Sequence, residues 1–458
     1  MYAPPISRRD ASISRPPLSF AQQSLWFVQQ LESTNAAYNI PLTVRVSGPL
    51  NVATLERALN EVVRRHEILR TTFIDLDGQP AQVISSPQHM SLTVADLCKR
   101  SEQEQADELV QHRRREAETH FDLAVGPLWR AKLLRLGNEE HIALFTMHHV
   151  ITDGWSMSLL LNELAKLYEA FSAGHPSPLE ELPVQYADYT VWQREWLRGE
   201  VLQAQLDYWR KQLSDAPAPL ELPTARAHTG NRTTAGATHN FTVPRDVTAR
   251  LNELMRSEQA TLSMLMLAAF ASLLSRYSGQ EDILIGMANT GRQRLELERL
   301  IGFFLNMLVM RVDLSGNPDF RALLRRVRQT TLAAYARQDL PFEMLVSELQ
   351  PGRSVGHNPL FQTSLVIQNA PRPDSNLKDL RIEELEPDMV AAKFDLTLVV
   401  AEFNGGLAGT FVYSTDLFDD ATIAGMVESL QQILRAAAGT TPAEQHGELL
   451  SAFNAELD

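Results

Sequence analysis

Two adjacent histidines and a nearby carboxylate stand out in the stretch TMHHVITDGWS, which contains His148, His149 and Asp153. A continuous apolar run at 142–147 precedes them and predicts a strand that is covered on both faces. A helical pattern begins near Trp155, so a short loop between two regular elements carries the polar side chains, and such loops often hold catalytic groups. If the strand alternation continues, the two imidazoles point to opposite sides.

The residue types alone leave three interpretations of this loop open. The histidines can be buried, hydrogen-bonded residues at the end of a strand. They can bind a metal, although neighbouring histidines on opposite faces do not easily share one ion and Asp153 would add only one ligand. Alternatively, one neutral imidazole takes part in proton transfer near pH 7 while Asp153 holds the loop in shape.

The composition is that of an ordinary globular protein of 458 residues, with 44% hydrophobic and 21% charged residues. This length predicts two or three lobes. The formal net charge of −14 argues against binding to nucleic acid or to a membrane surface, and no apolar run reaches the roughly 18 residues that span a bilayer. The single cysteine, Cys98, excludes a disulfide within the chain and fits a cytoplasmic location.

Both halves of the sequence mix helix and strand patterns, which predicts an α/β (α+β) fold. A stretch rich in Pro, Ser and Gly predicts a linker at 175–184, between an N-terminal lobe at 18–174 and a C-terminal lobe at 185–458. Residues 1–17 are polar and Pro-rich and lack the apolar segment of a secretory signal, so we expect a flexible lead-in.

Four local patterns are specific enough to predict single elements. Apolar stripes at helical spacing predict helices at 50–67 and 158–171, and the segment 261–277 is apolar almost all round, as in a buried helix. The sequence Asn-Gly-Gly at 404–406 lies between two apolar runs and predicts a β-hairpin.

The loop sequence HHVITDG resembles the HHxxxDG motif of condensation domains of nonribosomal peptide synthetases, which belong to the chloramphenicol-acetyltransferase-like superfamily of acyltransferases. That motif by itself has low specificity. Six further segments resemble the other motifs of this family in the family's order, so the resemblance is strong and covers about 18–369. These segments are LSFAQQSLWFVQQLE (18–32), RRHEILRTTF (64–73), VQYADYTVWQREWL (184–197), IGFFLNMLVMRVDL (301–314), RQDLPFEMLV (337–346) and GHNPLFQTSLVIQN (356–369).

The resemblance implies two chloramphenicol-acetyltransferase-like lobes in a V-shaped pseudo-dimer with a central tunnel. It implies an amide-forming acyltransferase of antibiotic biosynthesis, in which the amine of an aminoacyl thioester attacks an acyl thioester. The substrates would arrive on the phosphopantetheine arm of a carrier protein or as a coenzyme A thioester, with no tightly bound cofactor and no metal. The implied partners are a peptidyl or aminoacyl carrier protein, an acyl-CoA or acyl carrier donor and an adjacent adenylation domain, and we expect a monomer.

The resemblance also assigns roles within the loop. The second histidine, His149, would face the reaction centre, either as a general base or as a group that orients the amine and stabilises the intermediate. His148 and Asp153 would be structural. In the superfamily this aspartate pairs with an arginine of the other lobe, for which Arg292 is the best match and Arg294 the second.

Further residues are candidates around the same loop. Gly154 is expected to give the backbone freedom for the turn and to let an oxyanion or a substrate arm come close. Arg65, in the second motif, is expected to brace the N-terminal lobe. The predicted lining of the substrate tunnel, which would equally suit an ordinary core or a strand end, consists of Trp155, Asn306, Met147 and Met307.

The subtype depends on the source of the acyl donor. If Met1 is the native start, only about 17 residues precede the first motif and the donor must come from elsewhere. A starter domain, which transfers a fatty acyl group from acyl-CoA to the first amino acid of a lipopeptide, is the favoured prediction. An elongation domain that takes a peptidyl group from an upstream synthetase is the alternative, an epimerisation domain shares the histidine motif, and the intact motif argues against a domain that only recruits partners.

Overall fold

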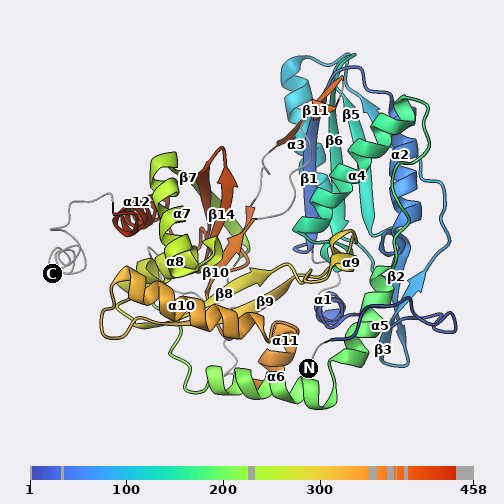
Figure 1. The fold of residues 1–458 in the computed structure, drawn as a ribbon. Helices are drawn as coiled ribbons and strands as arrows, with labels where there is room; N and C mark the ends of the chain where they lie inside the picture. Colours follow the sequence, from blue (N-terminus) through green and yellow to red (C-terminus); the bar gives the residue numbers. More distant parts are fainter. Residues whose placement is uncertain are drawn as a thin grey trace. The chain divides into compact units, whose positions relative to one another are not determined.

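A computed structural model describes residues 3–31, 36–224, 233–349, 358–368, 376–377, 379–385 and 390–439 (Figure 1). The chain divides into two compact units, each of which contains one large sheet. The predicted mixed α/β fold is therefore confirmed. Unit 1 comprises Met1–Gln203, Thr290–Asn306 and Ala370–Asp388, and unit 2 comprises Ala204–Asn289, Met307–Asn369 and Met389–Asp458.

The large sheet of unit 1 carries the histidine loop. Its strands are ordered β11-β12-β1-β6-β5-β4, and they are antiparallel except for the parallel pair β4 and β5. A separate hairpin is formed by β2 and β3. The bounds are β1 Asn39–Ser47, β2 Thr71–Leu76, β3 Gln79–Ile84, β4 Thr93–Asp96, β5 Trp129–Arg135, β6 Glu140–His148, β11 Asn376–Leu377 and β12 Leu380–Leu385.

Strand β6 explains why the sequence before the histidines is apolar without interruption. Alternate side chains of a strand point to opposite faces. Ala143 and Phe145 belong to the main core of unit 1, whereas Ile142 and Leu144 pack in a smaller cluster on the other face. Both faces are covered, so every position of the run is apolar, as the sequence predicted for a buried strand.

Helices cover both faces of this sheet. Helices α2 and α4 lie side by side over the main core, as Figure 1 shows, and α3 packs near β1 and β6. The two helices predicted from apolar stripes at 50–67 and 158–171 correspond to α2 and α4. The helices within unit 1 are α1 Phe20–Leu31, α2 Val52–Arg65, η1 Glu67–Arg70, α3 Glu102–Glu118, η2 His149–Ile151, α4 Gly154–Ser172, α5 Tyr186–Trp196 and α9 Leu295–Glu298, and α6 Gly199–Gln212 crosses into unit 2.

Unit 2 is built around the apolar helix α8, which is buried along most of its length as predicted. Its seven described strands are ordered β13-β7-β15-β14-β10-β8-β9, with β10 parallel to β8 and β14. The predicted hairpin joins β14 to β15 through Asn404 and Gly405, whose φ values of 49° and 77° suit a type I′ turn. The bounds are α7 Arg245–Glu258, α8 Leu262–Ser278, α10 Phe320–Tyr335, α11 Phe342–Leu349, α12 Asp420–Ala437, β7 Ala235–Val243, β8 Asp282–Asn289, β9 Asn306–Asp313, β10 Thr363–Ile367, β13 Val390–Ala391, β14 Leu396–Phe403 and β15 Gly406–Ser414.

The boundary between the units differs from the predicted lobe boundary. Residues 175–184 lie between α4 and α5 without helix or strand, as expected of a connection, but the units separate later, between Gln203 and Ala204. In addition, Thr290–Asn306 returns to unit 1, and β12 adds a strand beside β1. The lobe predicted at 185–458 therefore includes segments that belong to unit 1, because these segments complete its sheet and its core.

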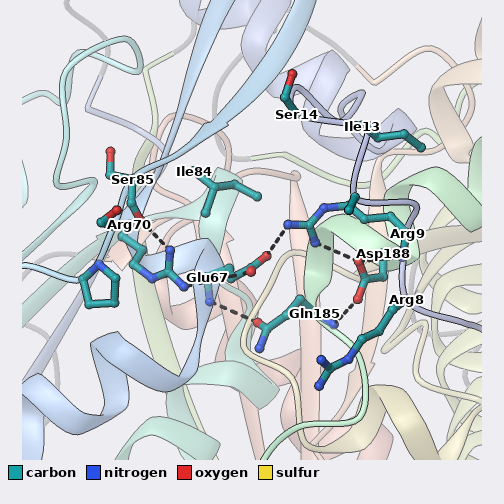
Figure 2. A pocket seen from close by; sticks show the side chains of 13 residues that line it. Arg8, Arg9, Ile13, Ser14, Glu67, Arg70, Ile84, Ser85, Gln185 and Asp188 are labelled. Atoms are coloured by element: carbon teal, nitrogen blue, oxygen red, sulfur yellow. Dashed lines mark hydrogen bonds and ion pairs between the residues drawn. The ribbon is translucent and has the colours of Figure 1, made fainter.

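The N-terminal segment also differs from its prediction as a flexible lead-in. Ile6 is only 6% exposed, and Arg8 donates hydrogen bonds to two backbone oxygens just before α5. Arg9 forms ion pairs with Asp188 at 2.7 Å and Glu67 at 2.9 Å, at the edge of a pocket of about 530 Å³ (Figure 2). Fixed carboxylates on unit 1 thus hold a segment that has few apolar residues of its own.

No single described helix is long and apolar enough to cross a bilayer, although α7 and α8, bent by 105°, satisfy length and composition together.

Candidate active site

His149 lies where β6 ends and the short helix η2 begins, and its side chain is half-buried. Its Nδ1 is 2.7 Å from the carbonyl oxygen of Thr152. A carbonyl oxygen only accepts hydrogen bonds, so Nδ1 carries the proton and Nε2 of the neutral ring carries the lone pair. The ring of Phe303 packs against the imidazole, with 4.6 Å between the ring centroids. The backbone N–H of His149 donates to the backbone oxygen of Tyr38. The loop thus orients one imidazole with the tautomer that a proton acceptor needs.

His148 has the opposite arrangement. Its side chain is 1% exposed, and its Nδ1 accepts a hydrogen bond of 3.1 Å from the backbone N–H of Val150. The proton of the neutral ring is therefore on Nε2. The aromatic rings of Phe121 and Tyr38 pack around the imidazole at 6.1 Å and 6.3 Å. These contacts agree with the structural role expected for His148.

Asp153 is the N-cap of α4 and is 3% exposed. Its carboxylate accepts hydrogen bonds from the backbone N–H of Ser156 at 2.8 Å and of Phe304 at 3.1 Å. It also pairs with Arg292, whose Nη2 lies 3.1 Å from Oδ1. The partner predicted for Asp153 is therefore present, and all the contacts described for this carboxylate are structural.

Arg292 lies within the same unit as Asp153, whereas the sequence analysis expected it in the other lobe. The reason is that Thr290–Asn306 returns to unit 1. Gly291 makes this return with φ of 66°, and a Cβ there would lie 2.1 Å from the carbonyl oxygen of Phe304. Arg294, the second choice, instead donates to the backbone oxygen of Ala3 at 2.8 Å.

The guanidinium of Arg292 is almost completely enclosed, with 1% of the side chain exposed. Burial lowers its pKa, although the charge and hydrogen bond of Asp153 act in the opposite direction. Its Nη1 donates to the carbonyl oxygens of Leu297 and Leu300, both at 2.6 Å, and Nη2 donates to Ser156 Oγ at 2.7 Å. Arg292 therefore ties its own segment to the start of α4.

A second buried ion pair lies between α2 and α4. Arg65 Nε donates to Glu163 Oε1 at 3.0 Å, and His66 Nε2 donates to Glu163 Oε2 at 2.8 Å. Burial alone would raise the pKa of Glu163, but the hydrogen bonds and charges of His66 and Arg65 outweigh it and leave that pKa below its ordinary value. Arg65 also donates to the backbone oxygen of Glu180. These contacts fit the bracing role expected for Arg65.

His66 extends this cluster to the segment that carries Arg292. The backbone N–H of Ile301 donates to His66 Nδ1 at 3.3 Å. Nothing in the sequence analysis singled out His66, Glu163 or Phe303. His66 and Phe303 lie in the second and fifth motifs, which the resemblance matched as segments without assigning a role to each residue, whereas Glu163 lies outside the matched motifs, in α4.

Gly154 is exposed and begins α4. Its φ is outside the positive region, and no described atom lies within 4 Å of the Cβ that another residue would add. The turn therefore does not require glycine, contrary to the prediction that Gly154 supplies backbone freedom. The open space beside Gly154 is compatible with its other predicted role, the close approach of an oxyanion or a substrate arm. Trp155 packs at the helix start, where Nε1 donates to the backbone oxygen of Glu298 at 3.0 Å.

The residues predicted to line a tunnel do not share one environment. Met147 is 2% exposed and belongs to the core of unit 1, because it points to the same face of β6 as Phe145. Asn306 and Met307 are half-buried at the start of β9, Asn306 in unit 1 and Met307 in unit 2. Of the described residues, no group of three or more His, Cys, Asp or Glu side chains could hold a metal ion.

Comparisons with known proteins show which family and which folds this chain resembles. The family profile described as Condensation domain matches residues 14–457. One of the linear gramicidin synthase proteins of Brevibacillus parabrevis is 48% identical over 92% of this chain, and malpinin synthetase of Mortierella alpina is 43% identical over 94%. The chain spans only 5% and 6% of the length of these relatives. The crystal structure of the X-domain from teicoplanin biosynthesis superposes with a TM-score of 0.83 and 29% identity, over 95% of this chain and 97% of that one.

Proposed function

The chain belongs to the condensation-domain family of nonribosomal peptide synthetases, and from that premise we propose how its site joins an acyl thioester to an amine. Family membership makes the chain an amide-forming acyltransferase that acts on substrates held by the phosphopantetheine arms of carriers. The observation that supports the proposed mechanism is the hydrogen bond from His149 Nδ1 to the carbonyl oxygen of Thr152.

In the proposed reaction, the neutral amine of an aminoacyl thioester attacks the carbonyl carbon of the donor thioester. The new C–N bond leaves a proton on nitrogen, and His149 Nε2 is the group suited to accept it or to orient the amine. Collapse of the tetrahedral intermediate breaks the C–S bond, and the departing thiolate takes up the proton. The donor is already activated, so the reaction needs no covalent intermediate with the protein and gains most from holding both substrates in line.

The other residues of the loop would act by position. The pair of Asp153 and Arg292 would keep the start of α4 fixed beside His149, and the open space at Gly154 would receive a substrate arm or the oxygen of the intermediate. A tunnel with two entrances, lined in part by Trp155, Asn306 and Met307, remains a prediction.

The partners are proposed on the same basis. The relatives named above are many times longer than this chain, so we propose that it works beside an adenylation domain and receives its acceptor from an aminoacyl carrier protein. The cytoplasmic location and the monomeric state remain predictions from the sequence.

The proposal includes two candidate acyl donors. The 48% identity to a linear gramicidin synthase protein favours a peptidyl group on an upstream carrier. The sequence favoured the fatty acyl-CoA donor of a starter domain. This donor remains a prediction, and the assay described below tests it together with the peptidyl donor. The two donors differ in the group attached to the thioester carbonyl, so one acceptor can be tested against both.

The test supplies the protein with an aminoacyl carrier protein and, in parallel, with peptidyl carriers or a panel of acyl-CoAs, and detects the new amide by mass spectrometry. We expect His149→Ala to lower the rate by about 10²- to 10⁴-fold, the usual effect of losing a positioned acid–base group. The exposed His175 provides the control variant His175→Ala, which should keep the full rate.

Three outcomes would contradict parts of this proposal. A His149→Ala variant at full rate, after subtraction of spontaneous aminolysis, would refute the role of His149. Exchange of the α-carbon hydrogen for deuterium without amide formation would favour epimerisation. Absence of product with every donor, in a protein that binds its carrier, would favour a recruiting role.

A further inference from the structure

The first helix begins with a capping box whose second residue also reaches the histidine loop. Ser19 Oγ accepts the backbone N–H of Gln22 at 3.1 Å, and Gln22 Oε1 accepts the backbone N–H of Ser19 at 3.1 Å. Capping boxes satisfy two backbone donors at a helix start, and either Glu or Gln can fill this position. Gln22 differs from Glu because its amide nitrogen is still available, and Nε2 donates to the backbone oxygen of Val150 at 3.0 Å.

We propose that Gln22 is a positioning residue for His149, a role that rests on the proposed function of His149. Val150 directly follows His149, and the two residues begin the single turn of η2. Gln22 is fully buried, so its hydrogen bond to Val150 is shielded from water. The amide nitrogen holds the backbone of η2, and this turn sets the carbonyl oxygen of Thr152 against His149 Nδ1.

The same capping box is connected to the other side of the imidazole. Tyr186 donates to the backbone oxygen of Phe303 at 2.6 Å, so its hydroxyl accepts from Ser19 Oγ, 3.0 Å away. Burial raises the pKa of Tyr186 well above its ordinary value, which keeps this hydroxyl protonated. Phe303 in turn packs its ring 4.6 Å from that of His149. His149 therefore lies between Val150, whose backbone oxygen accepts a hydrogen bond from Gln22, and Phe303, whose ring packs against the imidazole.

The direction of each hydrogen bond in this series, from Tyr186 through Ser19 and Gln22 to Val150, is fixed. Ser19 Oγ has one proton, which goes to Tyr186, and its lone pair accepts from the backbone N–H of Gln22. Gln22 uses its oxygen for Ser19 and its nitrogen for Val150. Among side chains of this size, only an amide supplies both an acceptor and a donor in these two places without a change of protonation state, because an ionised carboxylate only accepts. This requirement explains a glutamine where a helix cap alone would accept glutamate.

The substitution Gln22→Glu separates the two contacts. It keeps the size of the side chain and the acceptor for Ser19, and it is the residue that a capping box prefers. In its ionised form it removes the donor and brings a carboxylate oxygen against the carbonyl oxygen of Val150. We expect kcat to fall by roughly 10- to 100-fold with a smaller change in the KM of the acceptor, the scale of effect that displacement of a catalytic group by about 1 Å produces.

A matched control lies at the same end of α1. Gln193 Oε1 accepts the backbone N–H of Phe20 at 3.1 Å, and its Nε2 donates to the hydroxyl of Tyr189 at 2.9 Å, away from the histidine loop. Gln193→Glu is the same chemical change at the same helix start, and it should leave kcat within about twofold of the wild type. Equal losses of kcat in Gln193→Glu and Gln22→Glu would overturn the proposal.

A double-variant comparison distinguishes positioning from general damage. If Gln22 acts through His149, Gln22→Glu has no further effect on the rate of a His149→Ala variant, whereas independent effects multiply and would overturn the proposal. If His149→Ala itself keeps the full rate, the proposed function fails and not the positioning role alone. If Gln22→Glu does not fold, Tyr186→Phe breaks the other connection and should show the same dependence on His149.

A readout without catalysis completes the test. In protein with ¹⁵N-labelled histidine, the His149 signals, assigned by their loss in His149→Ala, should report a proton on Nδ1 in the wild type and in Gln193→Glu. In Gln22→Glu this preference should weaken. An unchanged His149 spectrum in Gln22→Glu would overturn the proposal even if the rate falls.

Discussion

The ion pair of Asp153 and Arg292 predicts that the contribution of an ion pair to the free energy of unfolding depends on its burial and not on its N–O distance. The side chains are 3% and 1% exposed and the N–O distance is 3.1 Å. Arg299 and Glu180 form an ion pair at nearly the same distance, 3.0 Å, but with side chains 63% and 82% exposed. Asp153→Asn and Glu180→Gln are therefore the same chemical change in two environments.

The expected loss at the buried pair comes from the contacts that Asp153→Asn leaves behind. An amide oxygen can still accept from Ser156, but the amide nitrogen then faces the N–H of Phe304, and Arg292 has lost its counter-charge. Leaving one charge of a buried pair uncompensated costs about 3–5 kcal/mol. A Coulomb estimate of about 5 kcal/mol at an effective dielectric constant of 20 has the same magnitude. The exposed pair is expected to contribute less than about 1 kcal/mol.

Urea unfolding followed by tryptophan fluorescence measures the difference. Five of the six tryptophans lie in unit 1, so the signal reports mainly on the unit that contains both pairs. At a slope of about 3 kcal/mol per molar urea, Asp153→Asn should lower the midpoint by roughly 1–2 M. Glu180→Gln should lower it by less than about 0.3 M. Equal shifts for the two variants would refute the argument from burial.

Three further predictions concern other parts of unit 1. Gly154→Ala should leave the free energy of unfolding unchanged or raise it by up to about 1 kcal/mol, because alanine is the better helix former, yet it should slow amide formation; a loss of stability would contradict the open space described there. Because the native pKa of Glu163 lies below the ordinary 4.5, its stabilisation is complete above that pH and is lost as pH falls through the native pKa; urea unfolding of Glu163→Gln and wild type should thus differ most near neutral pH and converge in acid, and a constant difference would contradict this. Arg9→Ala should lower stability by about 1–3 kcal/mol, because Asp188 keeps only its backbone donors, and should expose the N-terminal segment to proteolysis; an unchanged urea midpoint and digestion pattern would contradict the packing in Figure 2.

The elements that the sequence predicted well are those with a local pattern. The apolar run of β6, the largely apolar α8 and the Asn-Gly turn between β14 and β15 each encode their structure within about 20 residues. The pairing of Asp153 with Arg292 was predicted from family resemblance, since residues 139 positions apart share no local signal. Local periodicity therefore predicted these elements, and the order of the family motifs led to the prediction of the ion pair.

The features that the sequence did not predict depend on contacts between distant segments. The N-terminal segment has the composition of a flexible tail, but its arginines meet carboxylates of η1 and α5 that are fixed by other contacts. Gly154 was predicted to allow a special backbone conformation, and its φ requires none. In both cases the residue types suggested a local cause, whereas the structure depends on the residues that surround them.

The site shows why the HHxxxDG motif alone has low specificity. Within this loop His149 is the group proposed to handle the proton, and the orientation of its ring depends on the carbonyl oxygen of Thr152, which the loop itself supplies. The loop in turn is held by residues from three other parts of unit 1: Gln22 in the first motif, Arg292 after β8 and Phe303 in the fifth motif. A chain that carried the seven-residue motif without these partners would have the proton acceptor without its fixed position. Because effective molarity falls steeply when reacting groups are misplaced, such a chain would lose most of the rate that this geometry provides.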